Sequence, residues 1–371
     1  MTRLAIVDDY PEPGLGHHPD LLVGLAEASL RVPGLTGLTR IYCPSAFIVD
    51  RTLPAGIDHR PFVRPVGVSP SRHREQMSAI HREAGDGGAG VFLNLFFDES
   101  HRSFPVRDAA PRVVQVLHRP AELADEVAGT GLDRDQEMVA YLRRTAPAGL
   151  FVVHTQTAYH DALAWLPAER LILLPWPSAS ESDVTERFAA AAPGAGQEPH
   201  VLLIGDAREA KGIHVLLTAL AGGGPLLRIV GQQPRGVEAA LRDRYPATRV
   251  EWETGWIPQS RLSAAISAAS TLVFPYLKTF SRHGGVSGAL AQALTFGKPL
   301  VVSTVLVDQL PESSAVLLVE PGDAAGLRQA INDALRRSPE LHRAAAGTLE
   351  EVRQDHTYDQ HLARIIARVT G

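Results

Sequence analysis

Two series of short aliphatic runs, separated by a stretch of different composition, restrict the folds open to this chain. The runs of the first half have the near-continuous hydrophobicity of strands buried on both faces. In the first half, the runs begin near Leu4, Thr39, Gly90, Arg112, Gly149 and Arg170. In the second half, they begin near His200, Leu226, Arg249, Thr271, Pro299 and Ala315. Helix-period segments such as 19–30 and 134–144 lie between runs, so we predict an α/β fold with two parallel sheets.

The stretch between the two series is rich in Pro, Ser, Ala and Gly. Residues 177–198 therefore fit a linker with at most one short helix. We predict Rossmann-like domains over residues 1–176 and 199–355, with a central cleft between them. Open parallel sheets bind ligands outside the carboxyl ends of their strands, so the site is expected in the loops at those ends.

Composition and charge exclude several classes of protein. The 371 residues include 36 basic and 41 acidic side chains, and a net charge of -5 argues against general nucleic-acid binding. Cys43 is the single cysteine, which excludes an internal disulfide and a zinc site built from several thiolates. No apolar run approaches the ~20 residues of a spanning helix, and the apolar start is too short for a signal peptide. We expect a cytoplasmic protein, while peripheral membrane contact and oligomeric state are left open.

A glycine-rich stretch, FSRHGGVSGALAQALTFGKPLVVS, occupies residues 280–303. Its glycines stand directly before a helical pattern, where unsatisfied N–H groups and a partial positive charge attract anions. Gly284, Gly285, Ser287 and Gly288 are therefore candidates for a phosphate cradle, with Ser287 also able to cap the helix. The alternative is a glycine-rich turn that only allows tight packing of helix on sheet.

The order of the loops in the second half is more specific than any one of them. GD-x-R-x-x-KG at 205–212 is followed by LRIVG, ETGWIP, LVFPY and the glycine-rich stretch. This order resembles the C-terminal donor domain of GT-B glycosyltransferases, family 4 in particular, over about residues 199–371. The segment 356–371 resembles the helix that returns to the N-terminal domain in that fold. The resemblance implies a GT-B fold and a retaining, nucleotide-sugar-dependent glycosyltransferase.

The resemblance also assigns roles at the donor site. Lys211 matches the lysine that neutralises the donor diphosphate, and Arg208 lies nearby. Ile257 matches the position whose backbone meets the nucleotide base. The backbone turn at the phosphates is matched by Gly285, Val286, Ser287 and Gly288.

Three positions depart from the family pattern. Family 4 enzymes commonly carry a basic residue where this chain has Asp206, and two glutamates where it has Gly284 and Gln292. Gln292 still offers a hydrogen-bond donor and acceptor, but no carboxylate charge. These departures imply either an unusual donor sugar or a noncatalytic nucleotide-sugar-binding relative.

The first half matches the family more loosely. Gly14 and Gly16 precede a helical pattern and resemble the glycine-rich first loop, and the adjacent His17 is a weak candidate for an acceptor contact. His118 ends a strand and resembles the histidine that many family 4 enzymes place beside the donor sugar. The alternative interpretation of His118 is a structural histidine whose ring is hydrogen-bonded at the end of a strand. His154, which ends the next strand, and Asp98 in the loop FFDESHR are weaker acceptor-site candidates.

No residue pattern supplies a convincing general base, which agrees with retaining chemistry. In that chemistry the departing phosphate oxygen takes the acceptor's proton. No Asp-x-Asp pattern occurs where a metal would be expected, so we predict no metal and no cofactor besides the donor substrate. The alternatives are a pseudoglycosyltransferase, a nucleotide-sugar epimerase or the noncatalytic relative. A Rossmann-type dehydrogenase is disfavoured because no G-x-G-x-x-G follows the first strand.

Overall fold

The computed structural model describes residues 2–8, 18–35, 37–44, 53–62, 70–95, 112–118, 120, 149–189, 198–255, 257–280, 285–311 and 315–371. The chain divides into two compact units. Unit 1 consists of Met1–Ser180 and Thr357–Gly371, and unit 2 of Glu181–His356. The last helix of the chain therefore belongs to the N-terminal unit, as the GT-B resemblance implied.

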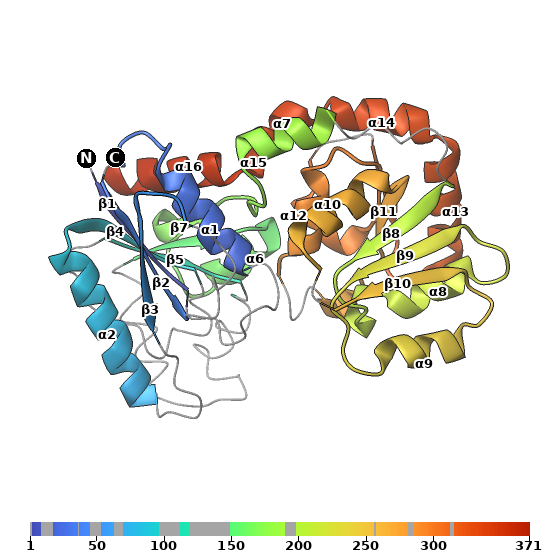
Figure 1. Ribbon diagram of the computed structural model, residues 1–371, viewed down its shortest axis with the longest axis horizontal. Helices are drawn as coiled ribbons and strands as arrows, with labels where there is room; N and C mark the ends of the chain where they lie inside the picture. The colour runs from blue at the N-terminus through green and yellow to red at the C-terminus, as the bar shows by residue number, and fades with distance from the viewer. Residues whose placement is uncertain are drawn as a thin grey trace. The chain divides into compact units, whose positions relative to one another are not determined.

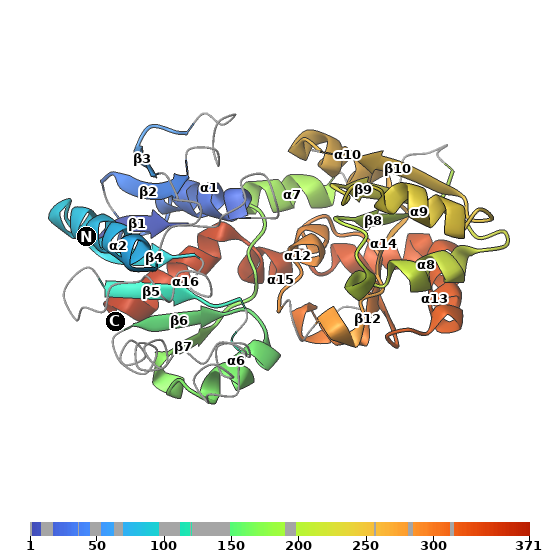
Figure 2. The same ribbon diagram turned by 90° about the horizontal axis from the view of Figure 1, so that it is seen from below.

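Unit 1 contains a fully parallel sheet. Its strands, among the described residues, are β1 (Arg3–Val7), β2 (Thr39–Pro44), β3 (Ile57–Phe62), β4 (Ala89–Asn94), β5 (Arg112–Val116), β6 (Leu150–Val153) and β7 (Leu171–Leu173). Figure 2 shows their spatial order, β3-β2-β1-β4-β5-β6-β7. The order reverses between β1 and β4, which is the switch point of a doubly wound sheet.

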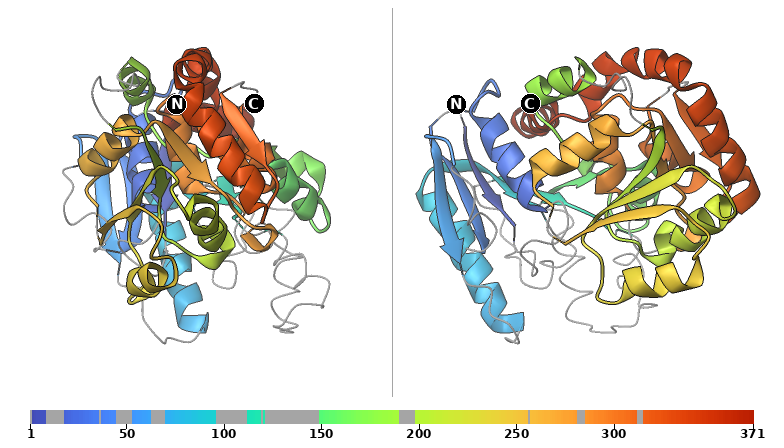
Figure 3. Two further views of the ribbon diagram at one scale, coloured as in Figure 1. Left: turned by 90° about the vertical axis from the view of Figure 1, so that its right-hand side faces the viewer. Right: turned by 45° about the vertical axis from the view of Figure 1, so that its right-hand side comes forward.

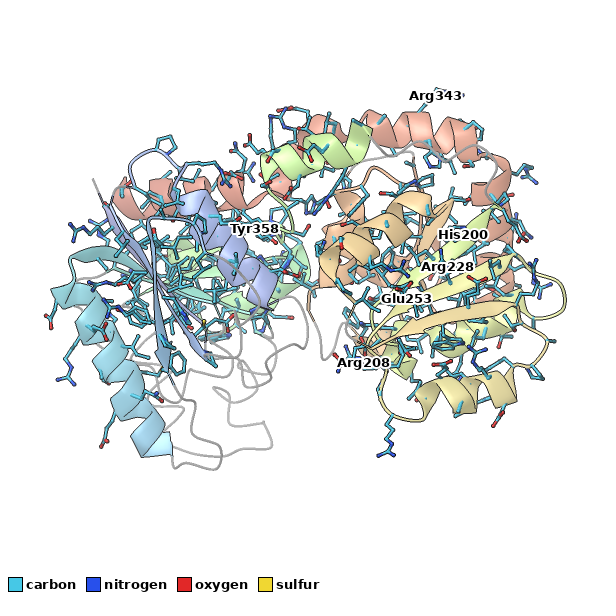
Figure 4. The ribbon with its side chains drawn as sticks, in the orientation of Figure 1. His200, Arg208, Arg228, Glu253, Arg343 and Tyr358 are labelled. Atoms are coloured by element: carbon cyan, nitrogen blue, oxygen red, sulfur yellow. The ribbon has the colours of Figure 1, made fainter. Side chains whose placement is uncertain are left out.

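Helices cover both faces of the unit 1 sheet. They are α1 (His18–Ser29), α2 (Pro70–Asp86), α6 (Gln156–Leu163) and α16 (Tyr358–Thr370), with a 3₁₀ turn at Ala168–Arg170. Apolar side chains of α2 and α6 share one buried cluster with β1, β4 and β6. α1 lies across the sheet from α2 and contacts α16 (Figure 1). Tyr358, labelled in Figure 4, packs its ring on Gly24 of α1, where a Cβ would lie only 2.3 Å from the ring.

Unit 2 contains a second fully parallel sheet. Its described strands are β8 (His200–Ile204), β9 (Leu226–Gly231), β10 (Val250–Thr254), β11 (Thr271–Phe274), β12 (Leu300–Ser303) and β13 (Val316–Val319). They follow the order β10-β9-β8-β11-β12-β13, with the switch point between β8 and β11. All the predicted runs of the second half are strands.

Both faces of the unit 2 sheet are buried, which explains its continuous aliphatic runs. Val201 and Leu203 of β8 face one cluster, and Leu202 and Ile204 face the other. The first face is covered by α8 (Ile213–Leu220), α9 (Val237–Arg244) and α13 (Ala324–Arg336), and the second by α10 (Gln259–Ala268) and α12 (Gly288–Leu294) (Figure 1 and Figure 3). Unit 2 also contains α7 (Glu181–Ala189), α14 (Ser338–Ala346), α15 (Leu349–Asp355) and 3₁₀ turns at Glu209–Lys211 and Thr304–Gln309.

Strand β3 was not expected, because three of its six residues are polar and it lies partly exposed at the edge of the sheet. Helix α7 is a short helix within the range expected to be a linker, and it belongs to unit 2. Arg187 of α7 donates to Thr295 Oγ1 at 2.7 Å and lies over the ring of Phe296. Within the described ranges, no helix is long and apolar enough to cross a membrane.

Candidate functional site

The loops after β8, β9 and β11 meet at the switch point of unit 2. Gly212, at φ 73°, approaches the loop after β11 so closely that a Cβ there would lie 1.9 Å from Pro275 O. Gly231, at the end of β9, would place a Cβ 2.7 Å from Gly205 O. Neither contact tolerates a side chain, so these two glycines allow the loops to come together.

Gln233 joins the loops after β8 and β9. Its Nε2 donates to Gly205 O at 3.0 Å and to Gly231 O at 3.2 Å, while its Oε1 accepts from Ala207 N at 2.6 Å. One amide side chain thereby fixes the backbone on both sides of Asp206. Sequence reasoning missed Gln233, because the backbone groups that it binds in the β8 loop are distant along the chain.

Lys211 is the buried cation of this region. It ends the 3₁₀ turn after β8 and is only 8% exposed. Its Nζ donates to Asp206 Oδ1 and lies 5.9 Å from the centre of the Tyr276 ring. A Cβ built on Gly205 would lie 3.3 Å from Lys211 Nζ and 4.0 Å from the Cβ of Ala289 in α12. The Lys211 ammonium is therefore close to both the β8 loop and the first turn of α12.

Arg208 lies in the same loop but is much more exposed. Figure 4 labels it at the carboxyl edge of the sheet. Its Nε forms an ion pair with Asp206 Oδ2, and its side chain is 61% exposed. Asp206 therefore accepts from two cations at once, a relationship that sequence reasoning did not foresee.

Ser287 begins α12 in the manner expected of a cap. Its Oγ accepts from Leu290 N at 3.2 Å and lies 3.1 Å from the hydroxyl of the buried Tyr276. Its own N–H donates to Gln309 Oε1 at 2.8 Å, and Gln309 Nε2 donates to Gly285 O at 3.2 Å. Gln309 therefore braces the turn from Gly285 to Ser287. Because the Ser287 amide is engaged, Ser287 contributes a cap to the turn rather than an amide for an anion.

The other donor-site candidates that the structure describes are half-buried or partly buried. Val286 and Gly288 are half-buried in the same turn, and Gln292 is half-buried one turn further along α12. Ile257 packs partly buried against the cluster that contains α10 and α12. Gly284 lies outside the described residues. The structure thus brings Lys211, Arg208 and the start of α12 to one edge of unit 2.

In unit 1, His118 and His154 lie together at the carboxyl ends of β5 and β6. Their ring centres are 6.1 Å apart, and both side chains are buried. His118 Nε2 donates to Leu95 O at 2.9 Å, and His154 Nδ1 donates to Leu174 O at 2.9 Å. Trp176 contacts both rings, and His361 of α16 stacks on His154. These are contacts of a packed interior.

Burial is the main cause that holds the pKa of His154 well below its ordinary value, with smaller effects from His361 and His118. Its Nε2 is buried without a hydrogen-bond partner. A neutral imidazole tolerates such a position, whereas an imidazolium does not. Gly14, Gly16, His17 and Asp98 lie outside the described residues. Among the side chains that are described, no group of three or more His, Cys, Asp or Glu could hold a metal ion.

Comparison with known proteins supports the geometry of both sheets. Residues 198–337 match the family model "Glycosyl transferases group 1". Sucrose-phosphate synthase from Thermosynechococcus elongatus is similar with a TM-score of 0.72 and 18% identity, over 100% of this chain and 98% of that one. A glycosyltransferase from Rickettsia africae ESF-5 gives a TM-score of 0.71 and 11% identity, over 99% and 98%.

Anabaena HepE, solved in complex with UDP and glucose, gives a TM-score of 0.65 and 13% identity, over 99% of this chain and 98% of HepE. A search of curated proteins by sequence finds no match. The fold is that of the GT-B glycosyltransferases. Residues 198–337 are similar to the glycosyl transferases group 1 domain, and the fold of the chain is similar to that of these solved glycosyltransferases.

Proposed function

We propose that the chain transfers a sugar from a nucleoside-diphosphate sugar to an acceptor, with retention of the anomeric configuration and without a metal ion or cofactor. The observation that carries the proposal is the position of Lys211. Its buried ammonium lies beside Gly205 and the first turn of α12, at the switch point of unit 2. Doubly wound sheets bind nucleotides outside this point.

A cation in this position suits the leaving group of glycosyl transfer. As the bond between the anomeric carbon and the diphosphate breaks, negative charge grows on a phosphate oxygen. An ammonium held in a partly water-excluded place stabilises that charge more strongly than one in bulk water. The ring of Tyr276 adds a favourable face for the same cation.

The proposal of retention rests on the family resemblance. If the acceptor attacks from the face that the diphosphate leaves, the departing oxygen takes the acceptor's proton and no protein base is needed. Lys211 would then stabilise the leaving group, and on the same resemblance we propose that His118 contacts the donor sugar. HepE, a structural neighbour, binds UDP and glucose, which supports a nucleotide-sugar as the class of donor.

Nucleotide binding is the first test. A ligand that binds only the native state raises the melting temperature, and the rise grows with the ratio of its concentration to its Kd. UDP, GDP and dTDP are screened against the purified chain, and we expect at least one of them to raise it. The matching nucleotide-sugars are then incubated with candidate acceptors.

Analysis of the products separates transfer from its alternatives. Transfer yields a glycoside and free nucleoside diphosphate. Conversion of one nucleotide-sugar to another would indicate an epimerase. Coupling of a non-sugar unit would indicate a pseudoglycosyltransferase, and binding without turnover would indicate a noncatalytic relative. If no nucleoside diphosphate shifts the melting temperature and no donor is consumed, the proposal is wrong.

A further inference from the structure

Two cations described in the candidate donor site, Lys211 and Arg208, already bind a carboxylate of the protein itself. Asp206 accepts from Lys211 Nζ through Oδ1 and from Arg208 Nε through Oδ2. It follows directly on Gly205, and Gln233 fixes the backbone on either side of it. Its carboxylate therefore occupies a place between the cations that a phosphate of the donor would use.

Asp206 is the more exposed member of the pair. Its side chain is 26% exposed, while that of Lys211 is 10% exposed. A diphosphate that binds Lys211 would come close to the Asp206 carboxylate, and like charges brought together weaken binding strongly.

We propose that Asp206 is an internal competitor of the diphosphate, which weakens the binding of the released nucleoside diphosphate more than that of the donor. This inference rests on the proposed function. A free nucleoside diphosphate carries more negative charge than the same diphosphate esterified to a sugar. Repulsion from one carboxylate therefore disfavours the product more than the donor, and the device limits product inhibition.

The test compares affinities by calorimetry with UDP, GDP and dTDP and with the corresponding nucleotide-sugars. Asp206→Asn keeps the size of the side chain and removes its charge. We expect this variant to bind the preferred nucleoside diphosphate about tenfold more tightly than the wild type, with a smaller gain for the nucleotide-sugar. Inhibition by the product should increase by a similar factor.

Four further variants test whether the change in affinity is caused by the charge of Asp206. Asp206→Glu keeps the charge and should keep the weak affinity. Asp333→Asn removes the carboxylate of an exposed Arg336 pair on α13 in the same unit, and should change nothing. Lys211→Ala should weaken binding, and Asp206→Asn added to Lys211→Ala should restore part of it, because the carboxylate repels the diphosphate with or without Lys211. Melting temperatures without ligand confirm that each variant is folded.

The outcomes separate this inference from the proposed function. If the wild type binds a nucleoside diphosphate and Asp206→Asn binds it equally or more weakly, Asp206 only positions Lys211 and the inference is wrong, while the proposed function stands. An equal gain in affinity for the nucleoside diphosphate and for the nucleotide-sugar would contradict the proposal that Asp206 weakens product binding more than donor binding. If no variant, the wild type included, binds any of the probes, the proposed function fails and the inference fails with it.

Discussion

The ring of Tyr276 lies 5.9 Å from the ammonium of Lys211, and its hydroxyl lies 3.1 Å from Ser287 Oγ. A single buried side chain therefore links the cation after β8 to the cap of α12. The Lys211 ammonium and the cap of α12 therefore share Tyr276 as a neighbour. The site of unit 2 thus depends on a residue that touches neither solvent nor, in our proposal, the substrate.

Removing the Tyr276 hydroxyl should destabilise unit 2 without removing the ring under Lys211. For Tyr276→Phe we expect the free energy of unfolding to fall by about 1 kcal/mol, the usual net value of one buried hydrogen bond. Denaturant titration measures the change. Tyr245→Phe is the control, since its hydroxyl contacts His214 in a less buried place and should cost less. Equal costs for the two variants would contradict the assigned role.

Lys211→Ala should lower kcat/KM for the donor by about a hundredfold or more, because it removes the charge that faces the leaving group. Lys211→Arg keeps a positive charge and should retain more of the activity. Steady-state kinetics with the donor found by screening measures both. Wild-type turnover in Lys211→Ala would show that the leaving group is stabilised elsewhere.

Gln233→Leu should loosen the loops after β8 and β9 together. It removes two donated hydrogen bonds and one accepted bond, so we expect a loss of about 1–2 kcal/mol in the free energy of unfolding. The Kd of the nucleoside diphosphate should rise as well, because the backbone on both sides of Asp206 loses its support. Calorimetry and denaturant titration test the two effects, and an unchanged Kd would argue that Gln233 only stabilises the fold.

The buried His154 predicts acid sensitivity. Its pKa in the native state is lowered by burial first and by His361 and His118 next, so the unfolded chain binds a proton that the native chain does not. The free energy of unfolding is therefore unaffected by His154 titration above the ordinary histidine pKa of about 6.5. It decreases progressively as the pH falls below that value. One such proton gives a slope of up to about 1.4 kcal/mol per pH unit.

Substitution of His154 by Gln isolates this contribution from those of other buried histidines. His200 and His342 also have pKa values lowered by burial, so the wild type retains some acid sensitivity for that reason. Denaturant titrations between about pH 5 and pH 7 span the ordinary histidine pKa. The free energy of unfolding should change less steeply with pH in His154→Gln than in the wild type. Identical slopes would mean that His154 does not control the acid response.

The fold was largely predictable because the central strands of unit 2, such as β8, β11 and β12, are buried on both faces and are therefore continuously apolar. Strand β3 escaped prediction because an edge strand with polar residues lacks that signal. The stretch around helix α7 was interpreted as a linker with at most one short helix because it is rich in Pro, Ser, Ala and Gly. The contacts of α7 with Thr295 and Phe296 show that it packs on unit 2.

The site was predictable only in part. Lys211 and Ser287 stand at positions where a motif and a helix start coincide, so the sequence indicated them. Gln233, Tyr276 and Gln309 act through partners that are distant along the chain, and no local pattern indicates such partners. Asp206 was recognisable as a departure from the family, but its pairing with two cations is visible only in three dimensions.

The most direct measurement is an experimental structure of the protein with the nucleoside diphosphate that stabilises it most. The account predicts a diphosphate oxygen within hydrogen-bond distance of Lys211 Nζ, beside Gly205 and the first turn of α12, with the Asp206 carboxylate moved off Lys211. A nucleotide bound elsewhere, with the pair of Lys211 and Asp206 intact, would contradict it.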